Sequence, residues 1–130
     1  GLRVGYALGS AELIGIMRKC SASWNLNVCA QKAAVAGLED QEYYQEQKAK
    51  IVEGREYLEK EMASLGCKVY PSQSNFIYFD TGKDPAWIQE QLMDKGIRIG
   101  AFEMSRVSVG TMEECQLFIR DLKEILETAE

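Results

Sequence analysis

Residues 67–80 have the sequence CKVYPSQSNFIYFD, and the hydrophobic period of the chain changes at this point. Residues 67–70 and 75–80 are rich in Val, Tyr, Phe and Ile, and Pro71 and Ser72 interrupt them. This pattern is typical of two short strands that are separated by a turn. The sequence therefore predicts that a sheet begins here.

The residues that follow predict the rest of a small unit. An Asp-Pro pair favours a helix over residues 85–95, and two further strands are predicted at 97–99 and 106–109. Thr111 followed by Glu114 is the pattern of a capping box, which starts the last helix. The element order predicts an α/β (α+β) fold with a short, mostly antiparallel sheet and helices on one face.

Upstream of residue 67 the pattern is mainly helical. A short strand is predicted over residues 4–8 and a helix over 10–21, followed by an alanine-rich helix over 28–38. A long helix is predicted over residues 41–65, because one apolar stripe recurs at a period of about 3.6 residues. The stripe consists of Ile51, Leu58, Met62 and Leu65.

Composition excludes several function classes. The net charge of −5 argues against binding to nucleic acid or to an anionic membrane surface. No apolar run approaches the roughly 20 residues of a membrane span. The chain has no histidine and four widely spaced cysteines, which argues against a zinc site and against Ser-His or Cys-His catalysis. We expect the cysteines to be buried, reduced thiols.

Three polar residues are candidates for ligand binding. Arg3 opens the first predicted strand, and Arg106 opens the strand Arg-Val-Ser-Val-Gly; a planar guanidinium matches phosphate or carboxylate oxygens. The spacing alone favours a solvent-facing Arg3 and a structural ion pair at Arg106. The amide of Asn75 could bind a ligand or shape the turn before it, and the turn role is favoured.

Six motifs follow one another in the order known from one enzyme family. The chain resembles the C-terminal part of class I/II (fold type I) pyridoxal-phosphate-dependent aminotransferases, especially the histidinol-phosphate aminotransferase branch. The resemblance covers nearly the whole chain. The motifs are GLRVGYA (1–7), NLNVCAQKAA (25–34), AGLED (36–40), VYPSQSNF (69–76), KGI (95–97) and RVSVGTMEE (106–114).

The resemblance implies a fold and a division into segments. Residues 1–27 would be a remnant of the large cofactor-binding domain, 28–65 bridging helices, and 66–130 the small C-terminal α/β domain. It also implies a cytoplasmic homodimer that acts in amino-acid biosynthesis.

The resemblance further implies site residues and a cofactor. Arg3 matches the arginine that binds the phosphate of pyridoxal 5'-phosphate, and Arg106 matches the arginine that binds the substrate carboxylate. Asn75 is assigned to substrate binding beside Arg106. The family's catalytic lysine would precede Gly1, so this chain is expected to hold no catalytic residue and to be inactive alone. The implied substrates are an amino acid or amino-phosphate and a 2-oxo acid.

One position departs from the family pattern. The second arginine that helps to hold the substrate phosphate in histidinol-phosphate enzymes aligns with Gly100, and Arg98 lies two residues before it. Arg98 has the same strand parity as Gly100 and could compensate. An alternative for the whole chain is a non-enzymatic module for amino-acid binding or oligomerisation, in which Arg106 would bind a free amino acid.

Overall fold

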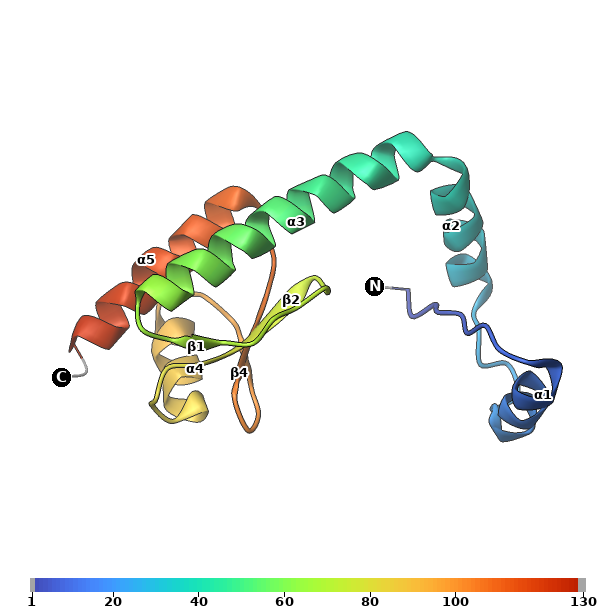
Figure 1. Cartoon of the computed structure of the whole chain (residues 1–130), viewed down its shortest axis with the longest axis horizontal. Coiled ribbons are helices and arrows are strands. Elements are labelled where there is room, and N and C mark those ends of the chain that lie inside the picture. The colour runs from blue at the N-terminus through green and yellow to red at the C-terminus, as the bar shows by residue number, and fades with distance from the viewer. Residues whose placement is uncertain (1, 129–130) are drawn as a thin grey trace. The chain divides into compact units, whose positions relative to one another are not determined.

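A computed structural model describes residues 2–128 of the chain. It divides into two compact units, Gly1–Gln45 and Glu46–Glu130 (Figure 1). Within the described residues, no helix has the length and apolar character that crossing a membrane requires.

The first unit contains two capped helices, α1 (Ala11–Cys20) and α2 (Val28–Glu39). Oγ of Ser10 accepts a hydrogen bond from the backbone N–H of Leu13 at 3.2 Å, which caps α1. Asn27 caps α2 in the same way, and its Nδ2 donates to the carbonyl oxygen of Leu2 at 3.1 Å. Asn27 therefore ties the start of the chain to the start of α2.

The strand predicted over residues 4–8 is wrong, because these residues have no regular secondary structure. A strand needs a hydrogen-bonded partner strand, and the described part of this unit contains none. The apolar residues of α1 also lack a covering layer: α1 has no buried residue, and the Leu13 side chain is 51% exposed.

The second unit is a four-stranded antiparallel sheet with three helices. The helix α3 (Gln41–Ser64) begins before the boundary between the units and contributes its C-terminal part to this one. The strand order is β1-β2-β4-β3, and every pairing is antiparallel. The other elements are β1 (Lys68–Val69), β2 (Phe76–Asp80), α4 (Pro85–Asp94), β3 (Gly100–Ala101), β4 (Ser105–Ser108) and α5 (Met112–Thr128).

A single core joins one face of the sheet to the three helices. Alternate strand residues, among them Ile77, Phe79 and Val107, are buried in it. The rings of Phe79 and Phe118 meet edge to face with centroids 5.9 Å apart. The helices contribute Leu58 and Met62 from α3, Ile88 and Leu92 from α4, and Phe118, Leu122 and Ile125 from α5. The predicted fold class, an antiparallel sheet with helices on one face, is confirmed.

The third strand starts later than predicted, at Gly100 rather than at residue 97. The backbone N–H of Ile97 instead donates to the last turn of α4 at 2.8 Å, where Gly96 adopts a φ of +83°. The carbonyl oxygen of Ile99 accepts a hydrogen bond from Nε2 of Gln89 at 2.7 Å. Because the helix cap and a side chain use these backbone groups, the sheet ladder begins only after them.

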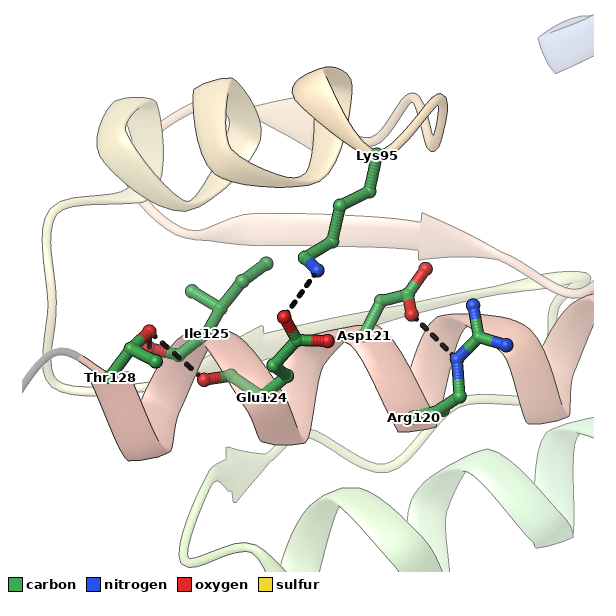
Figure 2. A network of polar contacts seen from close by, with 6 residues as sticks. All are labelled: Lys95, Arg120, Asp121, Glu124, Ile125 and Thr128. Carbon is green, nitrogen blue, oxygen red and sulfur yellow. Dashed lines mark hydrogen bonds and ion pairs between the residues drawn. The ribbon is translucent and has the colours of Figure 1, made fainter.

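One polar contact links α5 to α4, and others form within α5 itself (Figure 2). Nζ of Lys95 lies 2.8 Å from Oε1 of Glu124 and links the end of α4 to α5. Asp121 is buried on α5, and its carboxylate accepts a hydrogen bond from Nε of the exposed Arg120 at 2.8 Å. At the end of the helix, Oγ1 of Thr128 donates to the carbonyl oxygen of Glu124.

Candidate anion-binding site

Arg106 lies in β4, on the sheet face that is turned away from the core. Its neighbours in sequence, Ser105 and Val107, are both buried, so the alternation of a strand directs Arg106 to the opposite face. In the ladder, Arg106 pairs with Tyr78 of β2 and with Gly100 of β3. The residue is half-buried.

Two aromatic rings flank the guanidinium of Arg106. Its Cζ lies 5.3 Å from the ring centroid of Phe76 and 5.2 Å from that of Phe102, both within the range of a cation–π contact. Among residues 2–128, no carboxylate lies within 4.0 Å of this guanidinium. The structural ion pair that the strand pattern favoured is therefore not formed.

The guanidinium of Arg106 borders a hollow of about 430 Å³. A second cation, the exposed Arg98, and the hydroxyl-bearing Ser108 border the same hollow. Gly100, the ladder partner of Arg106, also lines it. Two guanidinium groups at one hollow favour an anionic ligand over a cationic or apolar one.

Asn75 is exposed in the bend before β2 and does not line this hollow. Its carbonyl oxygen accepts a hydrogen bond from the backbone N–H of Val109 at 2.8 Å. The turn is instead shaped by Ser72, whose Oγ donates to the carbonyl oxygen of Phe76 at 2.6 Å and accepts from Ser74. The structure thus gives the turn role to Ser72 and does not bring Asn75 to Arg106.

Arg3 belongs to the other unit and is exposed. Its φ of +61° lies in the left-handed region, which a non-glycine residue occupies only at a cost. Within the described residues its guanidinium has no ion-pair partner. Gly1, with which the first motif begins, lies outside the described residues.

Sequence reasoning missed the aromatic partners of Arg106. Phe76 lies on the same face of β2 as Tyr78, which pairs with Arg106 of β4. The pairing register of β2 and β4, had it been known, would therefore have predicted the contact between Phe76 and Arg106. Phe102 lies in the turn after β3, where no periodic pattern predicts the direction of a side chain. Only the folded turn shows that this ring lies against Arg106.

The cysteines divide between the two units. Cys67 and Cys115 are buried, as predicted, and burial raises the pKa of the Cys67 thiol to about 11 and that of Cys115 above its ordinary value. Cys20 and Cys29 are exposed, which contradicts the prediction that all four are buried. The reason is that the first unit has almost no core. Among residues 2–128, no cluster of three or more metal-ligating side chains is found.

The sequence matches a protein family over most of its length. The family described as "Aminotransferase class I and II" matches residues 1–122. A histidinol-phosphate aminotransferase of Moorella thermoacetica is 36% identical and aligns with 97% of this chain and 34% of its own length. Histidinol-phosphate aminotransferase 2 of Carboxydothermus hydrogenoformans is 35% identical, with 98% of this chain and 37% of its own length aligned. The chain thus spans about a third of the length of these curated relatives.

Solved structures agree with this fold. A structure from Erwinia carotovora atroseptica matches with a TM-score of 0.83 and 26% identity, over 98% of this chain and 38% of that chain. The histidinol-phosphate aminotransferase of Sinorhizobium meliloti, solved in complex with pyridoxal-5'-phosphate, matches with a TM-score of 0.72 and 29% identity. That match covers 88% of this chain and 34% of that chain.

Proposed function

The chain belongs to the aminotransferase class I and II family, and from this premise we propose the activity of the protein that contains it. The protein transfers an amino group between an amino acid or an amino-phosphate, of the histidinol-phosphate type, and a 2-oxo acid. The observation that carries the proposal is the half-buried Arg106, whose guanidinium borders a hollow and has no ion-pair partner in residues 2–128.

Pyridoxal 5'-phosphate is the proposed cofactor, and it supplies the electron sink for the chemistry at the substrate's α-carbon. Arg3 would bind the phosphate of this cofactor through its planar guanidinium. In this proposal residues 1–27 belong to the cofactor-binding domain, 28–65 are bridging helices, and 66–130 form the small domain. The match of residues 1–122 to the family supports the assignment, since it includes the motif that contains Arg3.

Arg106 would bind and orient the anionic group of the substrate. A carboxylate accepts two parallel hydrogen bonds from one guanidinium, and this bidentate pair fixes the orientation of the ligand as well as its position. Such positioning can supply a large part of a rate enhancement. Asn75 is proposed as a weaker contributor to substrate binding from outside the hollow, since its exposed amide can donate and accept hydrogen bonds.

Arg98 is the proposed contact for a substrate phosphate. It lines the same hollow as Arg106, while the intervening Gly100 carries no side chain that could bind a ligand. A substrate with one anionic group would need only Arg106, whereas a phosphorylated amino donor would also bind Arg98. The two arginines therefore form a natural pair of variants.

The proposal predicts unequal effects of replacing these two arginines in the protein that contains the chain. For an amino acid whose only anionic group is its carboxylate, Arg106→Ala should raise KM about 100-fold, since two charge-assisted hydrogen bonds are lost. Arg106→Lys should fall between this variant and the wild type, because lysine keeps the charge but not the planar fork. Arg98→Ala is the matched control and should leave this KM within about twofold, since exposed charges interact weakly.

Steady-state kinetics with an amino acid and with a phosphorylated amino donor would measure these effects. An Arg106→Ala variant with an unchanged KM for both substrates would refute the assignment. Tight binding of free amino acids to the chain in calorimetry, with no cofactor present, would instead favour the non-enzymatic binding module.

The chain alone is proposed to be inactive, because the resemblance places the catalytic lysine ahead of residue 1. A single-turnover assay of the chain with pyridoxal 5'-phosphate and amino acids should give no amino-group transfer above the protein-free control. We also propose a homodimer in the cytoplasm that acts in amino-acid biosynthesis. The free cysteines support the location, since reduced thiols are the rule in that compartment.

A further inference from the structure

The side chain of Arg106 is held by cation–π contacts rather than by a counter-ion. Two rings lie beside it: Phe76 of β2 and Phe102 of the turn after β3. Their centroids lie 5.3 Å and 5.2 Å from Cζ of Arg106. Phe76 is itself fixed by Tyr78, whose ring meets it edge to face at 5.7 Å and 86°. The cation therefore lies against one ring from β2 and one ring from the turn after β3.

Gly100 is what allows Phe102 to lie against Arg106. A Cβ added at position 100 would lie 2.8 Å from Cε2 of Phe102 and 3.5 Å from Nε of Arg106. The first distance is too short for two carbon atoms, so any side chain at position 100 would displace the ring. Phe102 is 61% exposed, so its ring contributes little to the core and can be replaced with little effect on it.

Cation–π contacts do not use the N–H donors of a guanidinium in hydrogen bonds. The π faces of aromatic rings attract the cation, but the five N–H donors lie in the guanidinium plane and can still reach a ligand. A side chain that is already held loses less rotamer freedom when the ligand binds. An ion pair with a carboxylate of the protein would orient Arg106 equally well but would occupy the donors.

We infer that Phe76 and Phe102 are positioning residues that hold the Arg106 guanidinium ready for the anionic group of the substrate, and that Gly100 provides the space for Phe102. The inference rests on the proposed function, because it takes Arg106 as the anion-binding residue. Phe102 is the more exposed of the two rings, and its removal should disturb the core least.

The test uses the protein that contains this chain, loaded with pyridoxal 5'-phosphate. Phe102→Ala should raise KM for an amino acid about fivefold, the loss expected for one cation–π contact, with kcat nearly unchanged. Phe102→Tyr keeps the π face and should restore the wild-type KM, whereas Phe102→Leu keeps only the apolar volume and should not. A primary amine without an anionic group is the control substrate, and its slow turnover should be the same in all three variants.

A double-mutant cycle separates action through Arg106 from a general structural role. In an Arg106→Ala background, Phe102→Ala should add no further increase in KM. Gly100→Ala should reproduce the effect of Phe102→Ala, because the added methyl group displaces the ring.

The outcomes that contradict the inference are distinct from those that contradict the proposed function. An equal loss with the amine substrate, or a full fivefold loss in the Arg106→Ala background, would overturn the positioning role. If Arg106→Ala raises KM but Phe102→Ala does not, only this inference fails. If Arg106→Ala has no effect, the proposed function fails with it.

Discussion

At the scale of single residues, the buried Cys67 thiol makes the free energy of unfolding depend on pH. Burial, and to a smaller extent the charge of Asp80, raises its pKa from 9.0 to about 11. The neutral thiol is therefore favoured in the folded state, and its contribution to stability is fully present below about pH 9. Between about pH 9 and pH 11 the unfolded chain releases this proton while the folded chain keeps it, so the free energy of unfolding falls.

This loss of stability at high pH should differ between a variant without the Cys67 thiol and a variant without an exposed thiol. Over pH 8 to pH 10.5, the urea midpoint of Cys67→Ala should fall less than that of the wild type, because the variant has no thiol to titrate at this site. Fluorescence of Trp87, which packs against the core, is a suitable probe in a Trp24→Phe background. Cys20→Ala, at an exposed cysteine, is the matched control and should decline as the wild type does. Equal declines in all three proteins would show that the Cys67 thiol does not titrate differently on folding.

Residue roles were predictable from the sequence only where chemistry and strand parity agreed. The strand over Arg-Val-Ser-Val-Gly was predicted, and within it the buried Val107 leaves Arg106 on the opposite face of the sheet. The ion pair that the pattern favoured is absent from residues 2–128, because two rings occupy the place of a carboxylate. Roles in turns were not predictable: Ser72 makes the hydrogen bonds expected near Asn75.

At the scale of elements, the start of α5 is a complete capping box. Oγ1 of Thr111 accepts from the backbone N–H of Glu114 at 3.2 Å, and the backbone N–H of Thr111 donates to Oε2 of Glu114 at 2.7 Å. Thr111→Ala should therefore lower the free energy of unfolding by about 1 kcal/mol. Urea unfolding, again followed by Trp87 fluorescence, would measure this loss.

Thr128, at the other end of α5, supplies the matched control. Its hydroxyl donates to the carbonyl oxygens of Glu124 and Ile125 in the preceding turn (Figure 2). Such bonds back to the helix add little stability, so Thr128→Ala should change the free energy of unfolding by less than about 0.5 kcal/mol. Equal losses in the two threonine variants would contradict the capping role of Thr111.

Helices were predicted more accurately than strands, and the reason is physical. A helix forms its own backbone hydrogen bonds, so its caps and its apolar period locate it in the sequence. They located both ends of α4, and the start of α5, to within a residue or two. A strand depends on its partner. The segment 4–8 has strand-like composition but no described partner. In the segment 97–99, the N–H of Ile97 bonds to the end of α4 and the carbonyl oxygen of Ile99 bonds to Gln89, so neither group is available for a strand ladder.

At the scale of the whole molecule, the core lies entirely within the second unit. Every member of the buried cluster falls between Leu58 and Ile125, while residues 2–45 of the first unit bury only Ala30. The segment 46–130 alone should therefore fold and unfold cooperatively, with the Trp87 midpoint close to that of the full chain. Denaturant titration of the isolated segment would measure this.

A shorter segment, 66–130, tests the domain boundary that the sequence predicts. It would lack Leu58 and Met62 of α3, both of which are fully buried in the core. Removing two large buried side chains costs several kcal/mol, of the order of the whole stability of a small domain. The 66–130 segment should therefore lack a cooperative transition. A sharp transition in 66–130 would show that α3 is dispensable, as a purely bridging helix would be.

The two outer strands of the sheet have a consequence for behaviour at high concentration. Both β1 (Lys68–Val69) and β3 (Gly100–Ala101) are only two residues long, and Lys68 puts a charge on the first of them. Long, flat, apolar edge strands pair with the backbones of other molecules and form intermolecular β-structure, whereas short or charged edge strands resist such pairing. This sheet therefore offers little template for aggregation or fibril growth, even though its central strands are rich in the residues that favour both.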